Sequence, residues 1–164
     1  MNIIKITFLF LFTNLCFGQD YLLHNEELIY SFKVKNGKMM FLVKDKENKY
    51  IVYRFGSSNK IELEYPQKNK QSWNKFTYSY YSRGGGKAND AMELYSIYFK
   101  VNNFEYTIYK DYYSENESFK TGILIINNLN KRVLDIKGKY NSIKGNPNLL
   151  KSENLINEDQ EKIR

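Results

Sequence analysis

Cysteine, histidine and proline are nearly absent from this sequence. It contains one cysteine (Cys16), one histidine (His24) and two prolines in 164 residues. Zinc sites are built mainly from cysteine and histidine ligands, and a Ser-His-acid hydrolase would have to use His24. No G-x-S-x-G nucleophile elbow is present. We therefore expect no catalytic residue of this kind, no metal site and no cofactor, and a His24 that is structural or exposed to solvent.

Arginine is scarce, whereas lysine is abundant. Only four of the 25 cationic residues are arginines, and the formal net charge of the chain is +7. Lysine is a compact charge on a flexible stem, better suited to loose attraction to anions than to bidentate recognition. The partners that this charge suggests are an envelope glycan, an anionic lipid surface or an acidic protein. The alternative is a lysine-rich surface that is simply solvated.

The N-terminal residues have the layout of a secretory signal peptide. Lys5 precedes an uncharged, mostly apolar run over 6–17, and the chain turns polar after Gly18. The run is shorter than the roughly 20 residues that span a bilayer as a helix. We predict a signal peptide over 1–18 and an exported protein, periplasmic or extracellular, with no transmembrane segment after cleavage. An uncleaved anchor, a buried strand and lipidation of Cys16 are the alternatives, and Leu15 in front of the cysteine disfavours the last.

Short segments rich in aromatic and β-branched residues follow, and several alternate with period 2. This pattern is typical of strands. The Asn36-Gly37 pair between two such runs predicts a hairpin with a type I′ turn. Nine strands are predicted, over 29–35, 38–44, 49–55, 60–65, 73–82, 92–101, 104–113, 119–127 and 131–137.

The spacing of these segments leaves no room for helices between them, which predicts an antiparallel meander. We expect an all-β domain over 19–148, a barrel of about eight or nine strands, with a sandwich as the alternative. The remaining residues, 149–164, are polar and have a poor apolar stripe, so we expect a tail that is frayed or loosely docked.

The loop between the fifth and sixth predicted strands has an unusual composition. Adjacent glycines can expose successive N–H groups as an anion-binding nest, and flanking cations would add positive charge. A flexible hairpin tip without a ligand is the alternative. The candidate binding residues in this loop are Arg83, Gly84, Gly85, Gly86 and Lys87.

Tyrosine is the other excess, with 15 residues. Adjacent tyrosines on a strand must point to opposite faces, so some rings should face solvent or a partner. Exposed tyrosines suit protein interfaces and sugar stacking. Ordinary cross-strand pairing is the alternative. Tyr78, Tyr80 and Tyr81 complete the candidate site, and no nucleic-acid partner is expected because no RNP-type motif is present.

Two carboxylates allow a hydrolytic alternative. Glu62 and Glu64 lie on one face of a predicted strand, about 7 Å apart at two strand steps. This is close to the separation that glycosidases use. The same alternation is typical of a half-buried strand that keeps its charges in water.

Three short sequence segments are YIVYRFG at 50–56, KIELEYP at 60–66 and YYSRGGG at 80–86. These segments are similar to parts of small exported bacterial β-proteins of uncharacterised function, and the resemblance implies no activity. The architecture also resembles that of periplasmic lysozyme-inhibitor barrels.

The preferred hypothesis is a non-catalytic exported binding protein of the cell envelope, with a tyrosine-rich sheet face and a basic glycine loop. An inhibitor or immunity protein against an envelope-targeting enzyme is the first alternative. A small carboxylate-based glycan hydrolase is the second.

Overall fold

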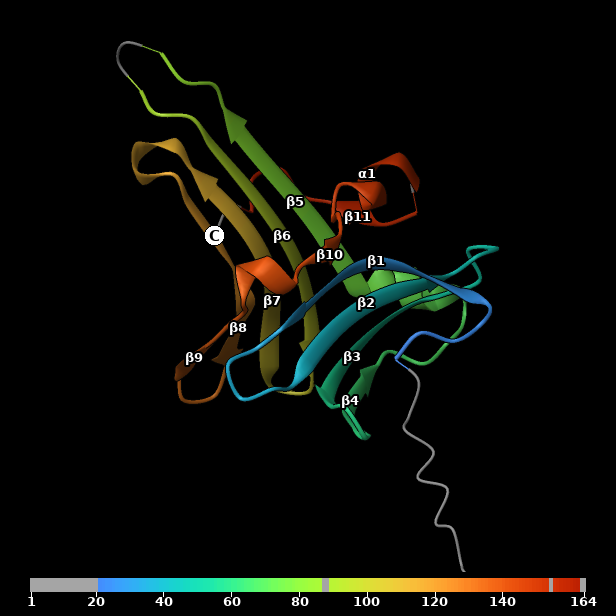
Figure 1. The fold of residues 1–164 in the computed structure, drawn as a ribbon. Coiled ribbons are helices and arrows are strands. Elements are labelled where there is room, and N and C mark those ends of the chain that lie inside the picture. Colours follow the sequence, from blue (N-terminus) through green and yellow to red (C-terminus); the bar gives the residue numbers. More distant parts are fainter. Residues whose placement is uncertain (1–20, 87–88, 154, 163–164) are drawn as a thin grey trace, which may run out of the picture.

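Two β-sheets packed face to face form the fold (Figure 1). The computed structural model describes residues 21–86, 89–153 and 155–162. One sheet has five strands in the order β10, β1, β2, β3, β4, and the other has six in the order β11, β5, β6, β7, β8, β9. The strands of the first sheet are β1 (Glu26–Lys33), β2 (Met39–Asp45), β3 (Ile51–Ser57), β4 (Lys60–Tyr65) and β10 (Lys144–Gly145). Those of the second are β5 (Phe76–Arg83), β6 (Met92–Val101), β7 (Phe104–Tyr113), β8 (Ser118–Asn127), β9 (Val133–Lys137) and β11 (Asn157–Glu158).

The all-β class is confirmed, and each of the nine predicted strands has a counterpart among β1 to β9. The main boundary error is at 73–75, which belongs to a 3-10 helix, η1 (Lys70–Lys75), rather than to β5. Two more 3-10 helices, η2 (Ser114–Asn116) and η3 (Tyr140–Ser142), and a short α-helix, α1 (Leu149–Glu153), complete the described elements. No helix in the described part of the chain is long and apolar enough to cross a membrane.

The predicted barrel is wrong, and the sandwich alternative describes the structure. Among the described residues, β4 is not paired with β5 and β1 is not paired with β9. The segment after β9 contacts the β1 side through the bridge Val34–Gly138, hydrogen bonds at Lys33 and the two-residue strand β10. The reason lies in η1, where Ser72 and Trp73 are buried. Ser72 Oγ accepts a hydrogen bond from the Ile51 N–H at 2.8 Å, and Trp73 Nε1 donates to the Asn48 carbonyl at 3.1 Å. These contacts end the first sheet and direct the chain into the second layer.

The main core fills the space between the two sheets and is largely aromatic. The rings of Tyr53 and Phe99 have centroids 4.8 Å apart, and Phe99 stacks on Tyr106 at 4.9 Å. Because β-strand side chains alternate between faces, the buried residues of β3, β6 and β7 that meet here are every second residue of each strand. The period-2 pattern of the sequence thus corresponds to the inner faces of the sandwich.

The β1–β2 turn differs from the predicted type I′ turn. The Gly37 N–H donates to the Val34 carbonyl at 3.1 Å, so the central residues of the turn lie one position earlier than predicted. Only Gly37 of the pair Asn36-Gly37 has a positive φ, +83°. A turn followed by one left-handed glycine is the three-residue hairpin loop, which suits the same Asn-Gly dipeptide.

The segment after 148 belongs to the sandwich and is not the predicted loose tail. Leu150 (0% exposed) and Ile156 lie in the main core. Strand β11 pairs in parallel with the edge of β5, and the Tyr98 hydroxyl donates to the Lys162 carbonyl at 2.8 Å. The sequence reading failed because these apolar residues are single and widely spaced, so they form no periodic stripe.

The outer face of the first sheet holds a buried ion pair. Arg54 Nη1 and Nη2 donate to the two carboxylate oxygens of Glu26 at 2.6 and 2.7 Å, and both side chains are almost fully buried. Arg54 Nε also donates to Glu64 at 2.7 Å, and Nη1 donates to the carbonyl of Tyr21. The segment that begins at Tyr21 covers this cluster, with the Tyr21 hydroxyl donating to the Ser57 carbonyl at 2.7 Å.

This ion pair predicts a loss of stability in acid. Burial raises the pKa of Glu26, but hydrogen bonds from Arg54 and the Leu23 N–H outweigh it and hold the pKa below the ordinary 4.5. A carboxylate with a depressed folded-state pKa stabilises the fold above its unfolded pKa, and this contribution disappears as the pH falls through the folded pKa. Between pH 7 and pH 3 the wild-type protein should therefore lose more free energy of unfolding than the variant Glu26→Leu/Arg54→Met. Urea unfolding at several pH values measures this, and parallel pH profiles would contradict it.

Candidate functional site

The glycine loop between β5 and β6 does not form the predicted nest. Gly84, Gly85 and Gly86 are exposed, and none has a positive φ, whereas a nest requires left-handed residues among its members. Arg83 Nε donates to the Asp90 carbonyl at 3.0 Å, which ties the guanidinium to its own loop. Lys87 lies outside the described residues. Within the described part, the loop is the tip of a long hairpin that projects beyond the sandwich (Figure 1).

The three tyrosines proposed from β5 do not share one exposed face. Tyr78 is 1% exposed in the core between the sheets, and its hydroxyl donates to Asn148 Oδ1 at 3.3 Å. Tyr80 lies on the same inner face further along the strand, and Tyr81 points to the outer face. Tyr80 and Tyr81 thus point to opposite faces of the sheet, as expected. Tyr78 is buried and is not accessible to a ligand.

The two carboxylates of β4 are both held in ion pairs. Glu62 pairs with Lys38 at 2.6 Å. Glu64 pairs with Arg54 at 2.7 Å and with Lys68 at 3.3 Å. They lie on the outer face of an edge strand, and neither carboxylate lines the cavities described below. The exposed His24 lies in the segment before β1, and its carbonyl accepts from Lys46.

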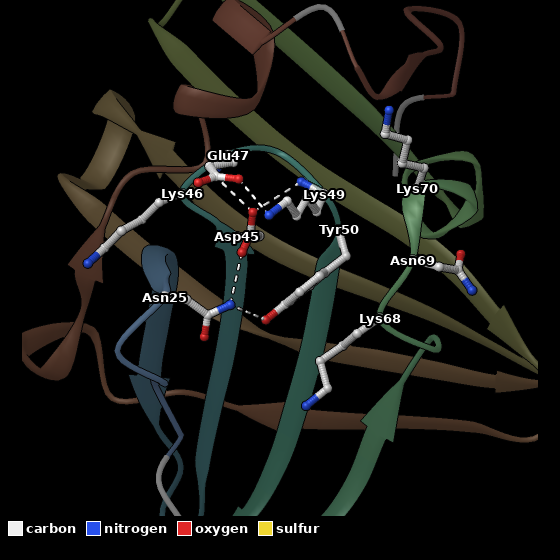
Figure 2. A pocket seen from close by; sticks show the side chains of 9 residues that line it. All are labelled: Asn25, Asp45, Lys46, Glu47, Lys49, Tyr50, Lys68, Asn69 and Lys70. Carbon is white, nitrogen blue, oxygen red and sulfur yellow. Dashed lines mark hydrogen bonds and ion pairs between the residues drawn. The ribbon is translucent and has the colours of Figure 1, made fainter.

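A polar cavity of about 470 Å³ lies at one end of the first sheet (Figure 2). The β2–β3 turn, the segment between β4 and η1 and the residue before β1 form its walls. Its floor is a hydrogen-bonded group in which Asn25 Nδ2 donates to Asp45 at 2.9 Å and to the Tyr50 hydroxyl at 3.0 Å. The remaining lining residues are Lys46, Glu47, Lys49, Lys68, Asn69 and Lys70.

The polar groups of this cavity are mostly satisfied within the fold. Burial raises the pKa of Asp45, but hydrogen bonds from Asn25 and from the Lys49 and Glu47 N–H groups outweigh it, so the pKa lies below the ordinary value. Lys49 pairs with Glu47 at 2.5 Å. The Lys46 ammonium points away from the floor and donates to the His24 carbonyl (Figure 2). We interpret this cavity as the packed end of a hairpin rather than as a ligand site.

A row of three aromatic rings on the inner face of the second sheet is a better candidate. The ring of Phe119 on β8 lies between Tyr112 on β7 and Tyr140 on η3, with centroids 4.7 and 4.6 Å away. Phe119 is 47% exposed and Tyr140 40% exposed, while Tyr112 is half-buried. We call Tyr112, Phe119 and Tyr140 the aromatic row. The row is accessible because β5 to β8 extend past the first sheet at the end where β5 and β6 are joined (Figure 1).

Tyr140 reaches the row because the chain crosses between the sheets directly after β9. The Gly138 N–H donates to the Thr121 carbonyl at 2.8 Å, and the Lys139 N–H donates to the Lys33 carbonyl at 2.7 Å. A Cβ at Gly138 would lie 2.5 Å from Phe32 and 2.7 Å from Thr121, so only glycine fits in this crossing. Ser142 Oγ then accepts from the Lys33 N–H at 2.8 Å, which fixes η3 against β1.

Lysines lie over the neighbouring rings of the same face. Tyr80 and Tyr95 have ring centroids 4.6 Å apart. Lys110 Nζ lies 5.3 Å from the Tyr95 centroid, and Lys151 Nζ lies 5.7 Å from the Tyr80 centroid. Neither lysine has an acidic partner among the described residues. This end of the sheet therefore combines open aromatic surface with two lysines that form no salt bridge in the described part of the chain.

The sequence reading identified only part of this surface. Tyr80 was among the predicted residues, and the rule that adjacent tyrosines of a strand point to opposite faces also applies to Tyr112 and Tyr113. Phe119 and Tyr140 were missed, since neither stands out by composition and Tyr140 follows the last predicted strand. Their juxtaposition with Tyr112 depends on the crossing at Gly138, for which the sequence gives no periodic signal.

Comparison with known proteins gives no assignment for this site. No protein-family model, curated protein or solved structure shows a significant match to the chain. Among the described residues, no three histidine, cysteine or acidic side chains gather closely enough to hold a metal ion. The function must therefore be argued from the geometry of the aromatic row and its surroundings.

Proposed function

We propose that this chain is a non-catalytic binding protein for an anionic glycan, which it holds on the aromatic row. The observation that carries the proposal is the row itself: Phe119 contacts a ring on each side, and two of the three rings are at least 40% exposed. The N-terminal pattern that predicts export supports a ligand of the cell envelope.

The geometry of the row favours a sugar chain. Aromatic faces offer rigid apolar area at little cost in conformational entropy, and the tyrosine hydroxyls add polar tips beside it. In the row the angles between neighbouring ring planes are 31° and 26° at centroid separations of 4.7 and 4.6 Å, so the rings are stacked with Phe119 in the middle. Such a stack presents ring edges and its end faces to a ligand. These apolar surfaces suit contact with the apolar face of a pyranose ring, with the sugar hydroxyls directed to water.

The charge around the row favours an anionic ligand over a neutral one. Lys110 and Lys151 lie on the same sheet end, and Lys120 lies on the outer side of β8 with its Nζ 4.8 Å from the Tyr113 centroid. Acidic groups lie at the same end: Glu93 is opposite Tyr112 across the β6–β7 pair, Asp111 is opposite Lys120 across the β7–β8 pair, and Glu115 and Glu117 lie between β7 and β8. The net charge of +7 adds long-range attraction, which accelerates association and weakens with salt.

The proposal predicts different effects for two exposed phenylalanines. Phe119 belongs to the row, whereas Phe104 (40% exposed) lies at the opposite end of the same sheet, in the β6–β7 hairpin. Dextran sulfate oligosaccharides serve as the anionic probe and dextran as its neutral counterpart, with affinity measured by isothermal titration calorimetry. Phe119→Ala should weaken binding of dextran sulfate about tenfold, equivalent to about 1.4 kcal/mol. Phe104→Ala should bind as wild type does.

Three results would contradict the proposal. Equal affinities of the two alanine variants would mean that the row is not part of the binding surface. Equal binding of dextran and dextran sulfate would mean that charge does not contribute to recognition. Binding to phosphatidylglycerol vesicles or to an envelope enzyme, with none to either polysaccharide, would replace the glycan by a lipid surface or a protein partner.

A further inference from the structure

A second cavity, of about 530 Å³, adjoins the aromatic row. It lies beside β8 and β9, where β9 ends and the chain crosses at Gly138. Phe119 lines this cavity and also belongs to the row, so the two features share a wall. A smaller hollow of about 300 Å³ shares Lys35, Asp135 and Lys137 with it, and the two together make one groove along β9.

The groove is strongly basic. Three lysines line its larger part: Lys35 from the β1–β2 turn, Lys120 from β8 and Lys137 from β9. Within the described part of the chain, none of the three has an acidic partner. The one carboxylate on the wall, Asp135, accepts a hydrogen bond from the Tyr109 hydroxyl at 2.8 Å. Its negative charge offsets one of the three lysines on the wall.

The other polar groups of the wall are satisfied, which leaves the ammonium groups as the available donors. The Thr121 hydroxyl donates to the Tyr109 carbonyl at 2.8 Å, and it is also hydrogen-bonded to the Tyr30 hydroxyl at 2.8 Å. The cavity of Figure 2 differs in this respect, because Lys46, Lys49 and Lys68 are each engaged there by a carbonyl or carboxylate.

We infer that the groove of Lys35, Lys120 and Lys137 binds the sulfate or carboxylate substituent of the glycan whose sugar rings lie on the aromatic row. This inference rests on the proposed function and specifies the ligand as an acidic polysaccharide. Lysine donates from a flexible stem as a point charge, so it accepts anionic oxygens without fixed bidentate geometry. Lys120 and Lys137 face the outer side of the second sheet, and the groove reaches Phe119 on the inner side around the edge of β8, which has no β9 partner before Gly122. A ligand that follows this edge would have its anionic groups in the groove and its sugar rings on the row.

The first test uses inorganic sulfate, so that it does not depend on the row. In titrations followed by amide NMR at pH 7, the N–H signals of Lys120, Thr121, Lys137 and Gly138 should shift together and saturate. The variant Lys35→Gln/Lys137→Gln should lose these shifts. The variant Lys46→Gln/Lys70→Gln removes the same charge from the cavity of Figure 2 and should keep them. Absence of these shifts in the wild-type protein, or their loss in both variants, would overturn the inference.

The second test uses polysaccharides and separates this inference from the proposed function. Lys35→Gln/Lys137→Gln should weaken binding of dextran sulfate about tenfold more than Lys46→Gln/Lys70→Gln does. Polygalacturonate, which carries carboxylates, distinguishes the two kinds of anionic group. If the two double variants bind equally while Phe119→Ala still weakens binding, the groove is not the anion site but the proposed function stands. If Phe119→Ala binds dextran sulfate as wild type does while Lys35→Gln/Lys137→Gln weakens binding, the row is not the sugar-binding surface. The groove is then still an anion site.

Discussion

Replacing Arg54 with methionine is expected to lower the free energy of unfolding by about 3–5 kcal/mol, because it leaves the carboxylate of Glu26 buried without its cation. Glu26 is 3% exposed and receives two hydrogen bonds from the guanidinium. Urea unfolding followed by circular dichroism measures the change. Arg54→Lys keeps the charge but loses the paired donors, so its loss should be intermediate.

Two further variants separate the buried charge from ordinary loss of contacts. Lys38→Met breaks the exposed pair with Glu62, which is expected to contribute at most about 1 kcal/mol. Glu26→Leu/Arg54→Met removes both charges and should recover much of the stability that Arg54→Met loses. If Arg54→Met destabilises the protein no more than Lys38→Met does, the buried pair does not stabilise the covered outer face.

The second large effect is expected in the C-terminal segment. Leu150 is completely buried in the main core, whereas its neighbour Leu149 is 49% exposed. Leu150→Ala removes apolar area from a packed site and should cost about 2–5 kcal/mol, depending on how far the surrounding residues collapse into the space. Leu149→Ala should change the stability by less than about 0.5 kcal/mol.

The same unfolding measurement decides whether the last residues belong to the folded unit. A single cooperative transition is expected for both variants, with the midpoint of Leu150→Ala shifted to lower urea concentration and its slope unchanged. Equal midpoints for Leu149→Ala and Leu150→Ala would mean that α1 does not pack in the core.

The strands were predictable because the signal for them is local. Ile61, Leu63 and Tyr65 of β4 alternate with Lys60, Glu62 and Glu64, and such a pattern requires one buried and one exposed face whatever the fold. What joins the strands is not local. The division into two sheets depends on the burial of Ser72 and Trp73 in a 3-10 helix whose last three residues were assigned to a predicted strand. The barrel was preferred because the short connections indicated a meander, and a meander alone does not distinguish a barrel from a sandwich.

The candidate site was less predictable than the fold for a related reason. The glycine loop attracted attention by composition, but its described glycines do not adopt the left-handed conformation that a nest requires. The aromatic row combines residues from three elements, and Tyr140 joins it only through the crossing at Gly138. Composition indicated that some tyrosines lie at the surface, but only the strand register and the crossing determine which ones.

Ring resonances of the phenylalanines provide the most direct test of the aromatic row as a glycan-binding surface. The protein is labelled on its phenylalanine rings, the signals of Phe119 and Phe104 are assigned with the two alanine variants, and dextran sulfate oligosaccharides are added. We expect a saturable shift of the Phe119 ring signals, unchanged Phe104 signals, and a smaller response at higher salt. An unchanged Phe119 under conditions where the oligosaccharide binds, or equal shifts of both rings, would contradict this expectation.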